Sequence, residues 1–117
     1  MPQVLFLFCD LFKETLSKHI KEPGVESTYK SFLEFKAENP LSKFGHSDYP
    51  YSHSYFKGKL HAKLTRDISI IYTLSGGDTK IFKLYGIFSH DESGTGTPSN
   101  LNRQKGLSTK MSNQNFY

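Results

Sequence analysis

Residues 55–90, YFKGKLHAKLTRDISIIYTLSGGDTKIFKLYGIFSH, decide the fold of this chain of 117 residues. Successive side chains of a strand point to opposite faces of its sheet. From Lys57 to Leu64, lysine and histidine occupy the odd positions, while glycine, leucine and alanine occupy the even ones. This alternation predicts a strand with a basic face toward solvent and an apolar face toward a core.

The same stretch predicts an antiparallel meander of three strands. We expect these strands at about 56–65, 67–75 and 79–88. Gly76-Gly77-Asp78 has the composition of a hairpin turn and joins the last two strands.

The N-terminal part predicts one strand and two helices. Residues 3–9 are an apolar run, and Asp10 then caps a helix. Pro23-Gly24 ends that helix. A second helix begins at about residue 26 and ends before Pro40. We expect the two helices to lie as a hairpin across the sheet.

The remaining segments predict two loops and a last helix. Residues 40–54 and 91–98 are rich in Ser, Pro and Gly and have no period, so we expect loops there. Ser99 or Asn100 then caps a C-terminal helix. The fold class is therefore α+β in one domain over residues 1–117, with helices on one face of the sheet and the other face free to bind a partner.

The charge is uneven along the chain. Residues 1–50 carry six lysines against seven acidic residues, and residues 51–117 carry nine basic residues against four acidic ones. This asymmetry indicates an acidic partner for the second half, with nucleic acid as the leading candidate. A soluble basic protein without a special ligand is the alternative.

The composition also bears on the cellular compartment. No run of about 18 apolar residues is present, so we expect no membrane-spanning helix. The apolar start lacks a basic segment and a cleavage site, so we expect no signal peptide. The single cysteine, Cys9, excludes an internal disulfide and fits the reducing cytoplasm.

The predicted basic face carries the groups that RNA cleavage without a metal requires. Such cleavage needs a base for the ribose 2′-hydroxyl, cations for the developing charge and an acid for the leaving 5′-oxygen. Histidine suits both proton roles because its pKa lies near neutrality. The candidates are His61 and His90 as proton carriers, Asp67 as orienting group or base, Lys57, Lys59, Lys63 and Arg66 as phosphate ligands, and Tyr72 or Tyr85 as stacking platforms. Asp67 also fits the start of a strand, and Tyr72 also fits the packing of a core.

A metal site is the competing interpretation of the histidines. His46, His53, His61 and His90 form neither an HxxxH pair nor a Cys/His array. We therefore expect no metal and no other cofactor.

A family resemblance sharpens this interpretation. Asp67-Ile68-Ser69-Ile70-Ile71-Tyr72, followed by a hairpin, a last strand and Ser89-His90, resembles the pattern of RelE/ParE-superfamily toxins. The pattern is most similar to the YafQ-type branch, where an aspartate, a hydrophobic run and a tyrosine precede a strand that closes with a small residue and a histidine. The stretch from Phe56 to Leu60 and the predicted order of elements also fit that family.

The resemblance implies a RelE-like microbial RNase fold and an endoribonuclease that acts as the toxin of a bacterial type II toxin–antitoxin system. Such toxins cut mRNA on the ribosome, where they also contact rRNA, and an antitoxin, here expected to be acidic, silences them. Asp67 matches the family aspartate, and His90 matches the family histidine that acts as general acid or base. The expected reaction is attack by the 2′-hydroxyl to give a 2′,3′-cyclic phosphate.

The chain departs from the YafQ-type pattern at two positions. Lys63 stands where that branch has a histidine, and His61 lies two residues earlier, on the same strand side and about 7 Å away. Gly86 stands where the family carries a basic residue, so Lys83 or Lys59 would have to replace it.

Several interpretations stay open at this point. The loop from Phe44 to Tyr49 is similar to an FG-x-D-x-Y stretch of YafO toxins, so the branch is undecided between YafQ-like and YafO-like. A ParE-like toxin that acts on DNA gyrase is a second possible function. A third is an RNA-binding module without catalysis.

Overall fold

The computed structural model describes residues 3–52 and 54–117. The described residues form ten elements. In chain order they are β1 (Gln3–Leu7), α1 (Asp10–His19), α2 (Val25–Glu38), β2 (Asp48–Pro50), the 3-10 turn η1 (Ser54–Phe56), β3 (Leu60–Lys63), β4 (Ile68–Ser75), β5 (Thr79–Ser89), α3 (His90–Ser93) and α4 (Leu101–Ser112). Among the described residues, none of the helices is long and apolar enough to cross a bilayer.

The strands form one sheet in the order β1-β5-β4-β3-β2. The meander of β3, β4 and β5 is antiparallel, which confirms the prediction. β1 pairs in parallel with β5, so that Leu5 lies opposite Ile81. β2 extends the sheet at the other edge by antiparallel pairing with β3. The prediction that residues 40–54 form only a loop is therefore wrong.

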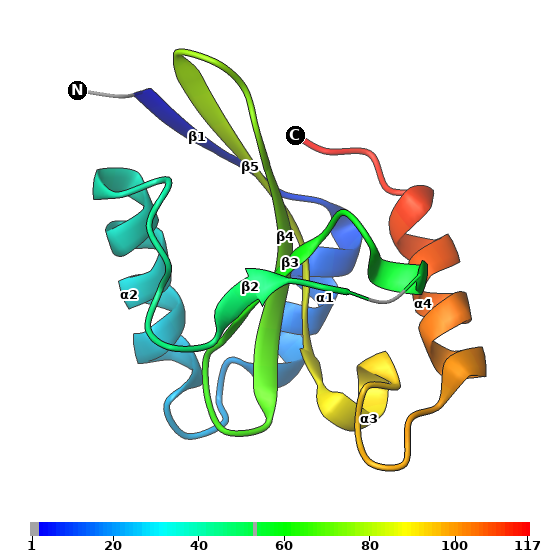
Figure 1. Cartoon of the computed structure of the whole chain (residues 1–117). Helices are drawn as coiled ribbons and strands as arrows, with labels where there is room; N and C mark the ends of the chain where they lie inside the picture. The colour runs from blue at the N-terminus through cyan, green and yellow to red at the C-terminus, as the bar shows by residue number, and fades with distance from the viewer. Residues whose placement is uncertain (1–2, 53) are drawn as a thin grey trace.

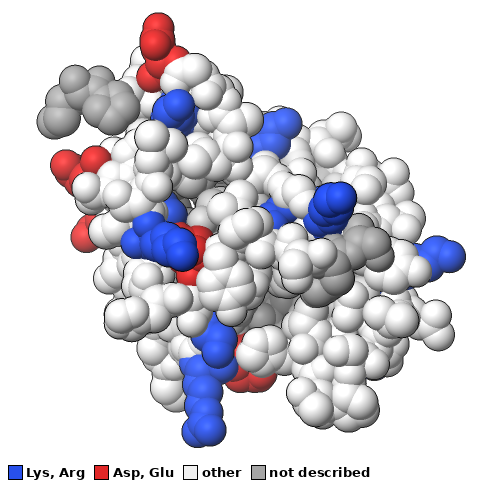
Figure 2. Space-filling model, in the orientation of Figure 1, with Lys and Arg blue, Asp and Glu red and all other residues white. Residues whose placement is uncertain are grey.

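The first strand of the meander is shorter than predicted. Residues 54–56 form a 3-10 turn, and the amide of Lys59 donates to the carbonyl of Phe56 at 3.0 Å. Gly58 follows that turn at a φ of +92°, in the left-handed region that favours glycine. The strand therefore begins only at Leu60, and Lys57 and Lys59 lie outside it. On the face that Figure 2 shows, lysine and arginine side chains lie at several separate places.

Helices cover both faces of the sheet, in contrast to the prediction of one covered face. Figure 1 shows α2 and α4 on opposite sides of the strands. Phe32 of α2 packs edge-on against Tyr72 of β4, with ring centroids 5.3 Å apart. On the other face, Phe116, which follows α4, packs against Tyr85 at 4.9 Å. Met111 of α4 is buried in the core, so only part of this second face is left open.

The C-terminal tail is tied to the start of the chain. The backbone groups of Phe8 and Tyr117 exchange two hydrogen bonds of 2.9 Å each. The amide of Leu11 donates to the side-chain oxygen of Gln114 at 3.1 Å. The segment predicted as a loop after the last strand also contains one helical turn, α3, before the chain reaches α4.

A buried ion pair joins α2 to the edge of the sheet. Lys36 Nζ lies 2.6 Å from Asp48 Oδ2, and both residues are 3% exposed. The Lys36 ammonium also donates to the carbonyl of Ser42, and the Asp48 carboxylate accepts from the amide of Phe44 and from the hydroxyl of Tyr72. Burial of Tyr72 and its contact with Asp48 raise the pKa of its hydroxyl. Each buried charge therefore has partners that offset its loss of water.

We expect Lys36→Met to lower the free energy of unfolding by about 3–5 kcal/mol, because it leaves the Asp48 carboxylate buried without its cation. The matched control is Lys30→Met on the same helix, since Lys30 pairs with Glu26 in solvent and such pairs contribute about 1 kcal/mol or less. Chemical denaturation of the two variants measures the difference. Equal losses would contradict the structural role of the buried pair.

Candidate active site

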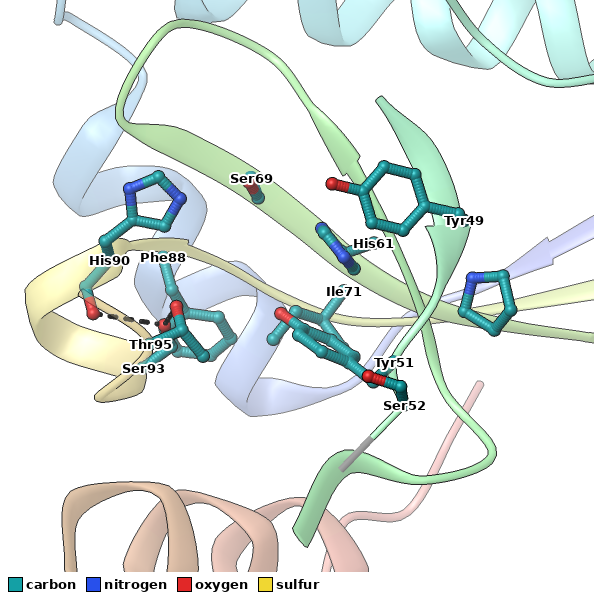
Figure 3. A pocket seen from close by; sticks show the side chains of 11 residues that line it. Tyr49, Tyr51, Ser52, His61, Ser69, Ile71, Phe88, His90, Ser93 and Thr95 are labelled. Carbon is teal, nitrogen blue, oxygen red and sulfur yellow. Dashed lines mark hydrogen bonds between the residues drawn. The ribbon is translucent and has the colours of Figure 1, made fainter. Parts of the chain in front are cut away.

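A hollow of about 240 Å³ opens on the face of the sheet that is turned away from α2 (Figure 3). Strand register builds its floor. His61 of β3 lies opposite Ile71 of β4, and Ser69 lies opposite Phe88 of β5. Side chains alternate along each strand, so these four share one face while Ile70 and its neighbours face α2. All four line the hollow.

Two tyrosines hold the His61 ring. The ring of Tyr51 stacks on it, with centroids 4.2 Å apart and planes at 25°. The ring of Tyr49 meets it edge-on at 4.6 Å. Burial is the main cause that raises the pKa of the Tyr51 hydroxyl, and the nearby Tyr49 raises it further, so this ring stays neutral. The three rings together form an aromatic wall along one side of the hollow.

His90 stands across the hollow from that wall. It is the first residue of α3, and Figure 3 shows Ser69 between its ring and that of His61. His90 Nδ1 lies 3.4 Å from Asp67 Oδ1, and 38% of the His90 side chain is exposed. The backbone amide of His90 points to the same carboxylate oxygen. Asp67 is thus placed to orient the imidazole through Nδ1, which leaves Nε2 for proton transfer with a bound molecule.

A second hollow of about 430 Å³ lies on the other side of His90. Asp67 and Asp91 line it together with Asn100 and Arg103, which belong to the start of α4. The Arg103 guanidinium pairs with the Asp91 carboxylate at 3.0 Å. His90 lines both hollows, and no other described residue is shared between the two.

The structure therefore brings together the three predicted catalytic residues, with His61 and His90 facing one hollow and Asp67 beside His90. The lysine and arginine residues predicted as phosphate ligands lie farther apart than the three catalytic residues. Lys57, Lys63 and Arg66 are exposed and do not line the first hollow. Register places Lys63 opposite Ser69, at the margin of the hollow.

Three other predicted ligands lie near the C-terminal tail. Lys59 Nζ stands 5.2 Å above the ring of Tyr85, and burial lowers the pKa of this lysine. Lys83 Nζ stands 5.5 Å above the ring of Phe116. These residues form a cluster of rings and cations outside the first hollow, and Lys83 and Lys59 do not replace a basic side chain at its floor.

The prediction that Tyr72 stacks on a base is wrong for this structure. Tyr72 is 1% exposed, faces α2 and donates its hydroxyl to Asp48. It lies opposite Leu60 and Leu84, so its strand position belongs to the apolar face. The alternative interpretation of Tyr72 as a core residue is confirmed.

The residue at position 86 shapes the floor of the hollow. A Cβ atom on Gly86 would come within 2.4 Å of the Phe88 ring and 3.2 Å of Thr15 Oγ1. A Cβ atom essentially never approaches another atom as closely as 2.4 Å, so Phe88 occupies the space that a larger residue at position 86 would need. A basic side chain at this position would clash with the Phe88 ring where it lies in this structure.

Sequence reasoning missed part of the lining. Tyr49 and Tyr51 stand two residues apart in the pattern Asp-Tyr-Pro-Tyr, and this alternation is the only local signal for the strand at that place. The hydroxyl groups of Ser93 and Thr95 also line the hollow, although nothing in their spacing marks them. They reach it because the chain turns directly after α3.

The described residues contain no cluster of three or more His, Cys, Asp or Glu side chains that would hold a metal ion. His46 is exposed on the loop before β2. His53, the other histidine considered for a metal, lies outside the described residues.

No family model and no curated protein matches the amino-acid sequence. Solved structures of similar fold include the following three. YafQ from E. coli strain BL21(DE3) has a TM-score of 0.63 at 18% identity, over 76% of this chain and 96% of that one. YafQ in the E. coli DinJ–YafQ toxin–antitoxin complex has a TM-score of 0.60 at 19% identity, over 76% and 94%. A YoeB/ParE toxin from Agrobacterium tumefaciens has a TM-score of 0.58 at 11% identity, over 75% and 98%.

These structures are covered almost in full, while about a quarter of this chain has no counterpart in them. At such identities the likeness concerns the arrangement of the backbone. It agrees with the α+β fold predicted from residues 55–90. The chain therefore has the fold of the RelE-like toxins.

Proposed function

We propose that this chain is the toxin of a type II toxin–antitoxin system and that it cuts mRNA without a metal ion. The observation that carries the proposal is the pair of Asp67 and His90 at the rim of a hollow walled by aromatic rings. The fold shared with YafQ supports it. We place the reaction in the cytoplasm and on the ribosome, as for an mRNA-cutting toxin.

The proposed reaction is an internal transfer of the phosphoryl group. The ribose 2′-oxygen attacks phosphorus, the bond from phosphorus to the 5′-oxygen breaks, and a 2′,3′-cyclic phosphate and a 5′-hydroxyl result. One imidazole takes the proton of the 2′-hydroxyl, and the other donates a proton to the leaving oxygen. His90, oriented by Asp67, is our candidate for the donor, and His61 for the acceptor.

The hollow itself suits a nucleobase better than a phosphate. Its described lining contains no Lys, Arg, Asp or Glu side chain and offers aromatic rings together with serine and threonine hydroxyls. Unstacked RNA bases bind by stacking on aromatic rings and by hydrogen bonds to their edges. The hollow is smaller than the about 300–1,000 Å³ of sites for drug-sized ligands. It therefore fits one ring system, with the phosphate at the rim near His90 and Lys63.

We propose an acidic antitoxin as the protein partner. The net charge of +4 favours an acidic partner. A complex of toxin and antitoxin is known for the YafQ of similar fold. The exposed residues Lys57, Lys63 and Arg66 are the candidate contacts for the antitoxin and for rRNA or mRNA phosphates.

We expect His90→Ala to lower the rate of RNA cleavage by about 10²–10⁴-fold, because it removes a group that moves a proton in the transition state. Growth arrest on expression should be lost in parallel. The control is His46→Ala, an exposed histidine outside the hollow. Mapping of RNA ends, with a chemical test for the 2′,3′-cyclic phosphate, measures the effect.

Two outcomes of that experiment would reject the proposal. Growth arrest with intact RNA and damaged DNA would favour a gyrase-directed, ParE-like toxin. Tight, salt-sensitive RNA binding without any cleavage would favour a non-catalytic RNA-binding module.

We expect Tyr49→Ala to raise the KM for RNA by the equivalent of about 1–3 kcal/mol, because the variant removes one ring of the aromatic wall. The value of kcat should change little. Tyr49→Phe is the matched control, since it keeps the ring and removes only the hydroxyl. Steady-state cleavage of a short oligonucleotide gives both constants, and a fall in kcat alone would argue against a stacking role.

A further inference from the structure

The short helix α3 is fastened to the end of α1 through Glu92. Glu92 Oε1 accepts a hydrogen bond of 2.9 Å from the amide of Ser89 and lies 2.6 Å from His19 Nε2. Its second oxygen pairs with the ammonium of Lys18. Lys18 and His19 are in the last turn of α1, so one carboxylate bridges two elements that are far apart in the sequence.

The His19 ring completes this link. It is buried, and its Nδ1 contacts the carboxylate of Glu22 while its Nε2 contacts that of Glu92. The ring thus lies between two carboxylates, one on each of its nitrogens. Burial alone would raise the pKa of Glu92, but hydrogen bonds from Lys18, the Ser89 amide and His19 outweigh it and lower this pKa to about 2.

The helix that carries His90 has little stability of its own. It has four residues, and helices of that length do not persist in water without tertiary contacts. Its first turn is held by a capping box in which Ser89 Oγ accepts from the amide of Glu92 at 3.1 Å. The carbonyl of His90 accepts from the amides of Thr95 and Gly96. The place of the His90 ring therefore depends on what holds this turn.

We propose that Glu92 is a positioning residue for His90. Glu92 locks the first turn of α3 onto the end of α1 and thereby keeps the His90 imidazole beside Asp67 at the rim of the hollow. Glu92 does not line either hollow and need not touch RNA. The expected effect of Glu92 on RNA cleavage rests on the proposed function. Loss of the link should therefore affect turnover and not RNA binding.

We expect Glu92→Ala to lower kcat by about ten- to a hundredfold and to leave KM nearly unchanged, because a small displacement of a reacting group has effects of that size. The kcat of Glu92→Gln should lie between that of Glu92→Ala and that of the parent chain. Its amide oxygen still accepts from Ser89, but it has no charge for Lys18 and His19. The matched control is Glu34→Gln, an exposed carboxylate on α2 that is expected to behave as the parent chain.

A second readout needs no RNA. The NMR signals of the His90 ring should shift or broaden in Glu92→Ala and Glu92→Gln and stay unchanged in Glu34→Gln. If the parent chain cuts no RNA, the proposed function fails, and the ring signals still decide the positioning role. Unchanged kcat and ring signals in a folded Glu92→Ala would overturn the proposal, as would a rise in KM alone. If Glu92→Ala does not fold, Glu92→Gln and Lys18→Met decide it by the same measurements.

The pH dependence of stability tests the link itself. The folded state lowers the pKa of Glu92 from an ordinary value of 4.5 to about 2. The carboxylate therefore stabilises the fold above about pH 4.5, and this contribution is lost as the pH falls through about 2. We expect the parent chain to be more stable than Glu92→Gln at pH 5 and the difference to shrink toward pH 2. A difference that is constant over this range would show that the charged groups do not hold Glu92 and would overturn the proposal.

Discussion

The buried pair of Lys36 and Asp48 is the interaction on which the hollow depends. β2 has three residues, includes a proline and lies at the edge of the sheet, so backbone hydrogen bonds alone hold it weakly. The Asp48 carboxylate fastens it to α2 through Lys36 and to β4 through Tyr72. The next residue, Tyr49, points to the opposite face and packs on His61. A charge pair on one face of the sheet thus supports the aromatic wall on the other.

This arrangement also explains why the chain keeps charged groups in its interior. A buried ion pair contributes little stability compared with apolar residues of the same size. It does specify register, because a shift of β2 by one residue would turn Tyr49 into the core and Asp48 toward the hollow. Lys36 would then be left buried without its carboxylate. The free energy lost in a shifted register therefore favours the pairing of β2 with β3 in which Tyr49 lies opposite His61.

The parts of the site that follow from local pattern could be predicted from the sequence. The hairpin fixes the register in which Ile68 lies opposite Ser89, so Asp67 and His90 emerge at the same end of the sheet. The aromatic wall could not be predicted, because Tyr49 reaches its place through an ion pair between distant segments. The basic strand face predicted from Lys57 onward is shorter in the structure, because Gly58 delays the start of the strand to Leu60. The sequence is compatible with Tyr72 either as a stacking platform or as a core residue, and its strand position on the apolar face makes it a core residue.

The contact between position 86 and the Phe88 ring has a consequence for how this protein can diverge. Phe88 is 5% exposed, and its ring fills the space beside the backbone of Gly86. A lysine or arginine at position 86 would meet that ring before it reached the hollow. A cation can therefore enter here only if the Phe88 ring moves aside or a smaller side chain replaces it. While Phe88 keeps its place, tighter phosphate binding has to come from residues at the rim, and the floor stays without a lysine or arginine.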